Sequence, residues 1–397
     1  MKKQISIIGG GPAAFLLAAY LDETKFEVTI YEKNKSLGRK FLVAGKGGFN
    51  LTHSESINEM IERYTPSEFL KVALLEFSNV DLQNWLKENG ILTFVGSSKR
   101  VYPQQNIKPI EVLNAILKVL EQKSVTVKYE HKWIGWGINN SILFKTKENE
   151  ININPDYVVF ALGGGSWKVT GSDGNWLSLF KEKGILVSDF QPSNCAFKVK
   201  WDNTFIKQYE GKPLKNIAIS CGRKMQKGEV VITQFGLEGN AIYALSPQIR
   251  KLINLNQTAD IYLDLKPTLT AETILHKIKK YKYKNTSQIL KNELKMSDAQ
   301  LGLVKTFISK TSFVNTIQLV KEIKALKIPI SGLAELDKAI STVGGVSLDA
   351  VNSSFELKIL PNQYCIGEML NWDAPTGGYL LQACFSMGVA LSHKINN

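Results

Sequence analysis

Three small residues near the amino terminus have the spacing of a nucleotide-binding turn. The segment ISIIGGGPAAFLLAAY (residues 5–20) contains Gly9, Gly11 and Ala14 in the pattern Gly-x-Gly-x-x-Ala. Gly9 permits a tight turn, Gly11 lets backbone N–H groups approach a pyrophosphate, and Ala14 lets a helix pack closely on a strand. The amino end of that helix attracts an anion. We therefore predict a dinucleotide site that includes Gly9, Gly10, Gly11, Pro12, Ala13 and Ala14.

An acidic residue follows this turn at the expected distance. Glu32 lies near the end of FEVTIYEK (26–33), a predicted strand. A carboxylate at this position accepts hydrogen bonds from an adenosine ribose and argues against a 2′-phosphate. Lys33, beside it, is included in the predicted site. The alternative is a glycine turn that serves the fold alone.

A second glycine pair opens an apolar segment near the carboxyl terminus, DAPTGGYLLQACFSMG (373–388). Gly377 and Gly378 would place another helix amino end there. Two such ends can serve two sites or meet around one long ligand. The residues alone leave both possibilities open, although each end attracts negative charge.

The elements around these residues predict an α/β fold. Residues 5–33 have a strand–helix–strand pattern, which requires a right-handed crossover and a parallel sheet. Helical patterning covers 67–90, and 125–153 resembles an antiparallel meander. Glycine-punctuated strands return after residue 335, as expected if one domain is interrupted by an insertion. We predict a doubly wound domain in two parts, separated by an insertion with strands at 195–265 and helices at 270–327.

Composition excludes several classes of protein. The chain has 397 residues, too many for one typical core, and no apolar run near the roughly 20 residues of a membrane span. Its four cysteines are scattered, so we expect a reduced cytoplasmic protein without a metal site, a signal peptide or a membrane anchor.

The net charge of +13 is concentrated in the region 250–330, which has 15 Lys or Arg against 6 Asp or Glu. Such a region could bind nucleic acid, but only five of the 49 basic residues are Arg, the residue that suits phosphate recognition. We therefore interpret it as a solvated helix surface and do not expect a nucleic-acid partner.

The long glycine-rich loop after the second strand and the meander are typical of FAD-containing two-dinucleotide-fold proteins. Seven further segments, spread along the whole chain, are informative: IIGGGPAA, GRKFLVAGKGGFNLTH, RVYPQQ, ALGGGSWKVTGSDGNW, TQFGLEGNAIYALS, STVGGVSL and GEMLNWDAPTGGYLLQACFSMG. Through these segments the chain resembles the BaiN-type bacterial flavoproteins, also called the aminoacetone oxidase family of FAD-binding enzymes. Many members have Ser-Gly-x-Gly-Arg-Cys-Asn where this chain has Ala44 to Asn50 without the Arg and Cys.

The resemblance implies FAD as cofactor. It also implies that residues 1–190 and 335–397 form the FAD domain, and that the inserted domain, 191–334, is a lid over the flavin. The first helix would bind the pyrophosphate, and the last would point at the N1/O2 edge of the flavin ring. Further contacts along the ribityl chain, phosphates, adenosine and ring would come from Arg39, Lys40, Gly45, Asn50, Gly163, Gly164, Gly367, Glu368, Thr376, Gly377, Gly378 and Tyr379.

The catalytic residue remains unassigned at this stage. Lys40 or Lys46 could place positive charge near the flavin, His53 could be a general base, and Tyr379 could lie at the ring edge. For each, a solvated, locally hydrogen-bonded or packed side chain is the alternative.

We therefore expect an FAD-dependent oxidoreductase that transfers hydride at flavin N5 to or from a small molecule. NAD(P)H could bind transiently, or dioxygen could reoxidise the flavin. The alternatives are an FAD-dependent RNA-modifying enzyme and a non-enzymatic FAD-binding sensor. The sequence does not indicate the substrate or the oligomeric state.

Overall fold

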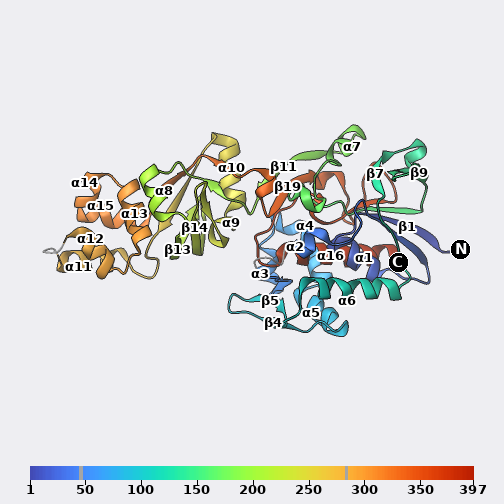
Figure 1. Ribbon diagram of the computed structural model, residues 1–397, viewed down its shortest axis with the longest axis horizontal. Helices are drawn as coiled ribbons and strands as arrows, with labels where there is room; N and C mark the ends of the chain where they lie inside the picture. The colour runs from blue at the N-terminus through green and yellow to red at the C-terminus, as the bar shows by residue number, and fades with distance from the viewer. Residues whose placement is uncertain (44–47, 282–284) are drawn as a thin grey trace. The chain divides into compact units, whose positions relative to one another are not determined.

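The chain forms two units, shown in a computed structural model that describes residues 1–43, 48–281 and 285–397 (Figure 1). The first unit joins Met1–Gln191 to Ile340–Asn397, and the second is Pro192–Ala339. The later boundary lies beyond the residue 334 expected from the sequence, because Ala339 packs in a small apolar cluster with Cys195 and Ala334.

A parallel sheet forms the centre of the first unit. Ile5 in the middle strand pairs with Val28 on one side and Tyr157 on the other, and the other printed pairings are also parallel. This arrangement confirms the predicted α/β Rossmann-type fold. The strand order is β20 (Gln363–Cys365), β10 (Tyr157–Phe160), β1 (Lys3–Ile8), β2 (Phe26–Tyr31) and β6 (Thr126–Lys128).

Helices pack along this sheet (Figure 1). Helix α1 is buried from Ala13 to Ala19, so its apolar character on every side reflects packing against both α16 and α6. The helices of this unit are α1 (Pro12–Tyr20), α2 (Arg39–Val43), α3 (Ile57–Ile61), α4 (Ser67–Glu76), α5 (Asn79–Glu88), α6 (Pro109–Gln122), α7 (Leu177–Glu182) and α16 (Tyr379–Asn396).

Two local expectations for this unit hold in kind but differ from the structure in their bounds. The helical pattern over 67–90 is two helices, because Ser78 caps α5 by accepting hydrogen bonds from the N–H groups of Val80 and Asp81. The antiparallel meander begins later than residue 125, because Thr126–Lys128 pairs in parallel with β2. The meander consists of β7 (Lys132–Trp136), β8 (Ile142–Lys145) and β9 (Glu150–Ile153).

Two smaller sheets complete the first unit. One has the order β3-β5-β4, with antiparallel pairing, and lies next to α5 and the start of α16. In the other, β11 pairs with β19. Their bounds are Thr52–His53 for β3, Arg100–Pro103 for β5, Thr93–Val95 for β4, Val187–Ser193 for β11 and Ser341–Val346 for β19.

The second unit has its own apolar core between an antiparallel sheet and helices. The sheet has the order β17 (Leu326–Ile330), β16 (Ala259–Asp264), β13 (Pro213–Cys221), β14 (Lys224–Ile232), β15 (Gly236–Glu238), β12 (Phe197–Lys198) and β18 (Gly332–Leu333). The helices are α8 (Asn203–Tyr209), α9 (Asn240–Tyr243), α10 (Ser246–Asn256), α11 (Ala271–Lys280), α12 (Thr286–Asn292), α13 (Asp298–Phe307), α14 (Lys310–Val314) and α15 (Thr316–Lys324).

Strands and helices are therefore less segregated in the second unit than the sequence pattern suggested. Helices α8, α9 and α10 interrupt the strand-rich region 195–265, and β17 and β18 return to the sheet after the helical region. Across the described residues, no helix combines the length and apolar character that a membrane span requires.

Candidate functional site

The predicted ligand-binding residues of the first unit follow the carboxyl ends of neighbouring parallel strands. Gly9 follows β1, Glu32 follows β2, Gly163 comes after β10, and Gly367 comes after β20. In open parallel sheets, this edge is where ligands bind. Residues that are more than 300 positions apart in sequence therefore lie along one edge of one sheet.

The glycine turn between β1 and α1 combines close packing with an open position. Gly9 has a φ of +104°, and a Cβ there would lie 2.4 Å from the carbonyl oxygen of Ala161. A Cβ on Gly10 would lie 2.1 Å from Leu37. By contrast, a Cβ on Gly11 would have no heavy atom of the described residues within 4 Å, apart from its chain neighbours. The first turn of α1 lacks intrahelical partners for its N–H groups, so this open position suits an anion.

Glu32 is held beside this turn with room for one more donor. Its Oε2 accepts a hydrogen bond from the N–H of Gly10 at 3.0 Å, and its Oε1 accepts two from Asn34, at 2.8 Å from the backbone and 2.6 Å from the side chain. A carboxylate has about four lone-pair positions. One position is therefore left for a ligand, which fits a ribose hydroxyl.

Arg39 and Lys33 connect the loops on the Glu32 side of the edge. Arg39 donates hydrogen bonds to the side chain of Asn34 at 2.7 Å and to the carbonyl of Val169 at 2.8 Å. Lys33 forms an ion pair with Asp173 at 2.9 Å. These two predicted residues therefore hold the 163–176 loop against the turn after β2.

Helices α1 and α16 run parallel and side by side (Figure 1). A Cβ on Gly388 would lie 2.5 Å from the carbonyl oxygen of Ala13, so the amino end of α1 lies beside Gly388. The other ends also meet, because the Asn396 side chain donates to the carbonyl of Tyr20 and accepts from the N–H of Asp22. Gly388 comes ten residues after Gly378, so α16 begins about 15 Å before α1 along a shared direction.

A third group of predicted residues lies between these two amino ends. Gly367 lies against Ala13 of α1 and near Cys384, a residue of α16 between Gly378 and Gly388. Next to Gly367, the carboxylate of Glu368 pairs with Lys40 at 2.9 Å and accepts a hydrogen bond from the N–H of Thr342.

The Lys40 ammonium group also donates to the hydroxyl of Ser166 at 3.0 Å. Gly164 packs against Thr342 and Glu368, since a Cβ there would lie 2.2 Å from the Thr342 hydroxyl. The structure thus brings Lys40, Gly164 and Glu368 together, and it shows Lys40 already paired.

The amino end of α16 packs against β3. Gly378 has a φ of +96°, and a Cβ there would lie 2.5 Å from the Cα of Thr52. The Thr52 hydroxyl donates to the side chain of Gln382 at 2.7 Å, and Gln382 donates to the carbonyl of Phe77. Both polar side chains are fully buried. This end of α16 is therefore held in place by side chains from the segment 52–77.

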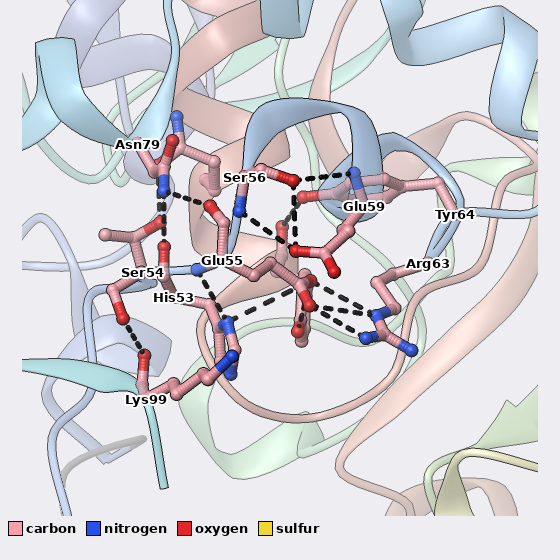
Figure 2. A network of polar contacts seen from close by, with 12 residues as sticks. His53, Ser54, Glu55, Ser56, Glu59, Arg63, Tyr64, Asn79 and Lys99 are labelled. Carbon is pink, nitrogen blue, oxygen red and sulfur yellow. Dashed lines mark hydrogen bonds and ion pairs between the residues drawn. The ribbon is translucent and has the colours of Figure 1, made fainter. Parts of the chain in front are cut away.

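A buried carboxylate connects the next residue of α16 to the same segment. Glu55 accepts a hydrogen bond from the Tyr379 hydroxyl at 2.6 Å and forms an ion pair with Arg63 at 2.8 Å. The ring of His53 stacks on that of Tyr379, with centroids 5.2 Å apart, and the Tyr64 hydroxyl donates to the Tyr379 carbonyl. Figure 2 shows His53, Glu55 and Arg63 converging in this network.

Local structure explains how these side chains meet. Helix α3 begins after a capping box in which the Ser56 hydroxyl accepts from the N–H of Glu59, and Arg63 lies in the turn that follows α3. Asn79, the first residue of α5, donates its side-chain amide to the carbonyls of His53 and Glu55 (Figure 2). The polypeptide on both sides of Glu55 is therefore fixed.

These contacts set the charge states at the α16 end. Burial acts to raise the pKa of Glu55, but hydrogen bonds from Arg63 and Tyr379 hold it below its ordinary value. Burial and the Glu55 carboxylate raise the pKa of Tyr379 far above its ordinary value. Burial lowers the pKa of His53 despite the nearby Glu55, so its imidazole is neutral at pH 7. Tyr379 and His53 thus lie at the predicted place but are engaged with protein partners.

The remaining predicted residues are less informative. Gly45 and Lys46 lie outside the described residues. Thr376 and Asn50 are half-buried, and the N–H of Asn50 donates to the carbonyl of Gly48. The sequence analysis did not identify Glu55 or Arg63, because both belong to an ordinary polar loop and helix pattern. The available signal for this ion pair was a Glu and an Arg eight residues apart, on either side of a short helix.

The sheet, the glycine turn and the acid after β2 define a Rossmann-type protein with the features of a dinucleotide site. The chain matches the HI0933-like protein Rossmann domain over residues 3–394, and it therefore belongs to that family. This match confirms the family resemblance carried by the seven motifs.

Two relatives with assigned activities align along nearly their whole length. The 3-dehydro-bile acid delta(4,6)-reductase of Clostridium scindens is 23% identical over 410 residues, covering 97% of each chain. The ribosomal RNA dihydrouridine synthase of Haemophilus influenzae is 25% identical over 403 residues, covering 98% of each chain. The open conformation of a flavocytochrome c3 fumarate reductase has a similar fold, with a TM-score of 0.52 and 13% identity, covering 98% of this chain and 77% of that one.

Proposed function

We propose that this protein binds FAD along α16 and is an oxidoreductase that saturates a carbon–carbon double bond conjugated to a carbonyl group. The observation that carries the proposal is the parallel offset of α1 and α16, with Gly388 against Ala13 and Gly378 about 15 Å away. A pyrophosphate and a flavin ring joined by a ribityl chain match two amino ends with this separation.

Each part of the edge has a proposed role toward FAD. The open position at Gly11 receives the pyrophosphate, and Glu32 accepts a ribose hydroxyl. The pair formed by Lys40 and Glu368 would contact the ribityl chain. The amino end of α16 after Gly378 favours negative charge on the ring. When bound, FAD supplies hydride transfer chemistry that the side chains alone do not have.

The reaction class is supported by what two relatives have in common. Their names describe different substrates, a bile acid and an RNA, but both describe hydrogen addition across a carbon–carbon double bond. In a 3-oxo-delta(4,6) steroid and in uracil, that bond is conjugated to a carbonyl group. One reaction type on different substrates is expected if the relatives share a cofactor site at this edge of the sheet. Residues elsewhere on the chain would then select the substrate.

The proposed site is tested by FAD binding to Gly11→Ala. Gly11 has a φ of −112°, which alanine adopts without strain, and the added methyl group has space in the protein alone. We expect FAD affinity to fall at least tenfold with an unchanged melting temperature. Gly332→Ala is the control, because its Cβ would make only ordinary contact with Lys198 in the second unit. Wild-type protein that binds no FAD, or Gly11→Ala that binds it equally well, would refute the proposed site.

The reaction is tested separately, with FAD-loaded protein under anaerobic conditions. Consumption of NADH or NADPH that depends on uridine-containing RNA or on a 3-oxo-delta(4) steroid would support it. An FAD-loaded protein that no nicotinamide reduces would favour the sensor alternative.

RNA is the second candidate substrate because of how charge is divided between the units. Residues 192–339 contain 24 Lys or Arg and 12 Asp or Glu, a net charge of +12, whereas the first unit has 25 and 24, a net charge of +1. The scarcity of Arg argued against nucleic acid, but a charge confined to one unit is what a polyanion-binding unit requires. RNA affinity that falls steeply with salt, and falls further in Lys279→Gln/Lys280→Gln, would support this candidate.

A further inference from the structure

The segment RVYPQQ, one of the seven matching motifs, has no role in the site described above. It begins with β5, the middle strand of the β3-β5-β4 sheet, where Arg100 pairs with His53 and Val101 pairs with Thr52. Val101 is fully buried, so Arg100 and Tyr102 face the opposite side of the strand. This strand therefore has one face in the core and one face available to a ligand.

Arg100 extends to the amino end of α16. Its Nε atom lies 3.4 Å from the place that a Cβ on Gly377 would occupy, and Gly377 has a φ of +122°. A Cβ at position 377 would therefore be in van der Waals contact with the guanidinium group, and the left-handed backbone there favours glycine. The two glycines that open α16 thus have different surroundings: Gly378 is pressed against the backbone of Thr52, whereas Gly377 lies beside the side chain of Arg100.

The guanidinium group of Arg100 differs from the other cations around the proposed site. Lys40 is paired with Glu368, and Arg63 with Glu55. Within the described residues, the guanidinium group of Arg100 has no hydrogen bond or ion pair. The buried carboxylate of Glu55 is already paired with Arg63 and Tyr379. Five N–H donors are therefore available to a ligand at this end of α16.

We propose that Arg100 binds the edge of FAD that gains negative charge on reduction, and so makes the bound cofactor a better electron acceptor. This inference rests on the proposed FAD site. The amino end of α16 contributes a partial positive charge, and Arg100 adds a full one at the same place. Arg100 thereby has the role toward the flavin ring that the sequence had suggested for Lys40, Lys46 or the helix end alone.

The test is the midpoint potential of bound FAD, measured by equilibration with a reference dye. For Arg100→Gln, we expect the preference for reduced over oxidised FAD to fall about tenfold, which is about 30 mV for a two-electron couple. Arg100→Lys retains the charge and should stay near the wild-type potential. Lys99→Gln is the matched control, because it removes an exposed charge from the adjacent residue and should leave the potential unchanged.

The outcomes separate this proposal from the proposed function. Wild-type protein that binds no FAD refutes both. If wild type and Arg100→Gln bind FAD with the same potential, only the role of Arg100 is refuted, and the FAD site stands. If Arg100→Gln does not bind FAD, the potential of Arg100→Lys tests the proposal instead. A potential within 10 mV of wild type supports the charge effect, and a drop of about 30 mV or more contradicts it.

Discussion

The amino ends of α1 and α16 are both preceded by glycines, but they are built in opposite ways. At α1, Gly9 and Gly10 are confined by Ala161 and Leu37, while Gly11 is open. The proposed contact with the ligand there is made by the backbone. At α16, Gly378 is pressed against Thr52, and side chains from several elements surround the helix start.

This difference shows how one protein can present two anion-favouring ends to one cofactor. The α1 end needs only a strand, a turn and a helix that follow one another in sequence. The α16 end must be placed about 15 Å farther along the same direction, and its position depends on contacts with residues 52–79. Substitutions at the two ends should therefore have different consequences.

Gly378→Ala should cause the largest loss of stability. Its Cβ would lie 2.5 Å from the Cα of Thr52, and backbone atoms cannot rotate away as a side chain can. The φ of +96° adds strain for alanine. We expect a loss of about 3 kcal/mol in the free energy of unfolding, measured by guanidinium titration.

Gly11→Ala is the matched comparison for Gly378→Ala, because the same methyl group meets open space at the α1 end. We expect its unfolding midpoint to equal that of wild type. Equal destabilisation by both substitutions would contradict the contrast between the two ends.

Tyr379→Phe should have a smaller effect on stability. It removes the hydroxyl that donates to Glu55 at 2.6 Å, and leaves a buried carboxylate with one donor fewer. Hydrogen bonds to charged groups contribute about 2 kcal/mol, so we expect a loss of that size in the free energy of unfolding.

Tyr364→Phe is the control for Tyr379→Phe, because within the described residues its hydroxyl makes no hydrogen bond. It should change stability by less than about 0.5 kcal/mol. If Tyr379→Phe is no more damaging than Tyr364→Phe, the Glu55 network does not hold the α16 end.

Sequence reasoning succeeded where local structure depends on adjacent residues. Gly9, Gly11 and Ala14 predict a turn between a strand and a helix because their roles are local, and the structure has β1 and α1 on either side. The parallel sheet followed from the same segment. Glu32 could be identified because a fixed distance separates it from the turn, and its carboxylate indeed accepts from Gly10.

Sequence reasoning failed where groups meet only through packing. Glu55 and Tyr379 are 324 residues apart, and neither belongs to a spacing rule. Arg100 is near Gly377 because β5 pairs with β3, which the apolar pattern did not reveal. Lys40 illustrates the converse, since its sequence position suggested a reactive cation and its pairing with Glu368 became visible only in the fold.

Acidification should cause the smallest loss of stability among these changes, and this loss should arise at the amino end of α16. Burial holds the pKa of folded His53 below its ordinary value of 6.5, so the unfolded chain takes up this proton at a higher pH than the folded chain. The contribution of the neutral His53 imidazole to the free energy of unfolding is therefore fully present above pH 6.5. It is lost as the pH falls toward the pKa of the folded state. Glu55, whose pKa is also lowered, adds a further loss below its ordinary value of 4.5.

Unfolding midpoints at pH 7.5 and 5.5 isolate the contribution of His53, because Glu55 stays ionised over this range. We expect wild type to lose stability between these values, and His53→Gln to lose less, since it cannot bind the proton. His276→Gln removes an exposed histidine of the second unit and should follow wild type. The α1 turn, residues 9–14, contains no titratable side chain, so FAD contacts there should not change with pH. An identical pH response in wild type and His53→Gln would show that the neutral imidazole stacked on Tyr379 does not support the start of α16.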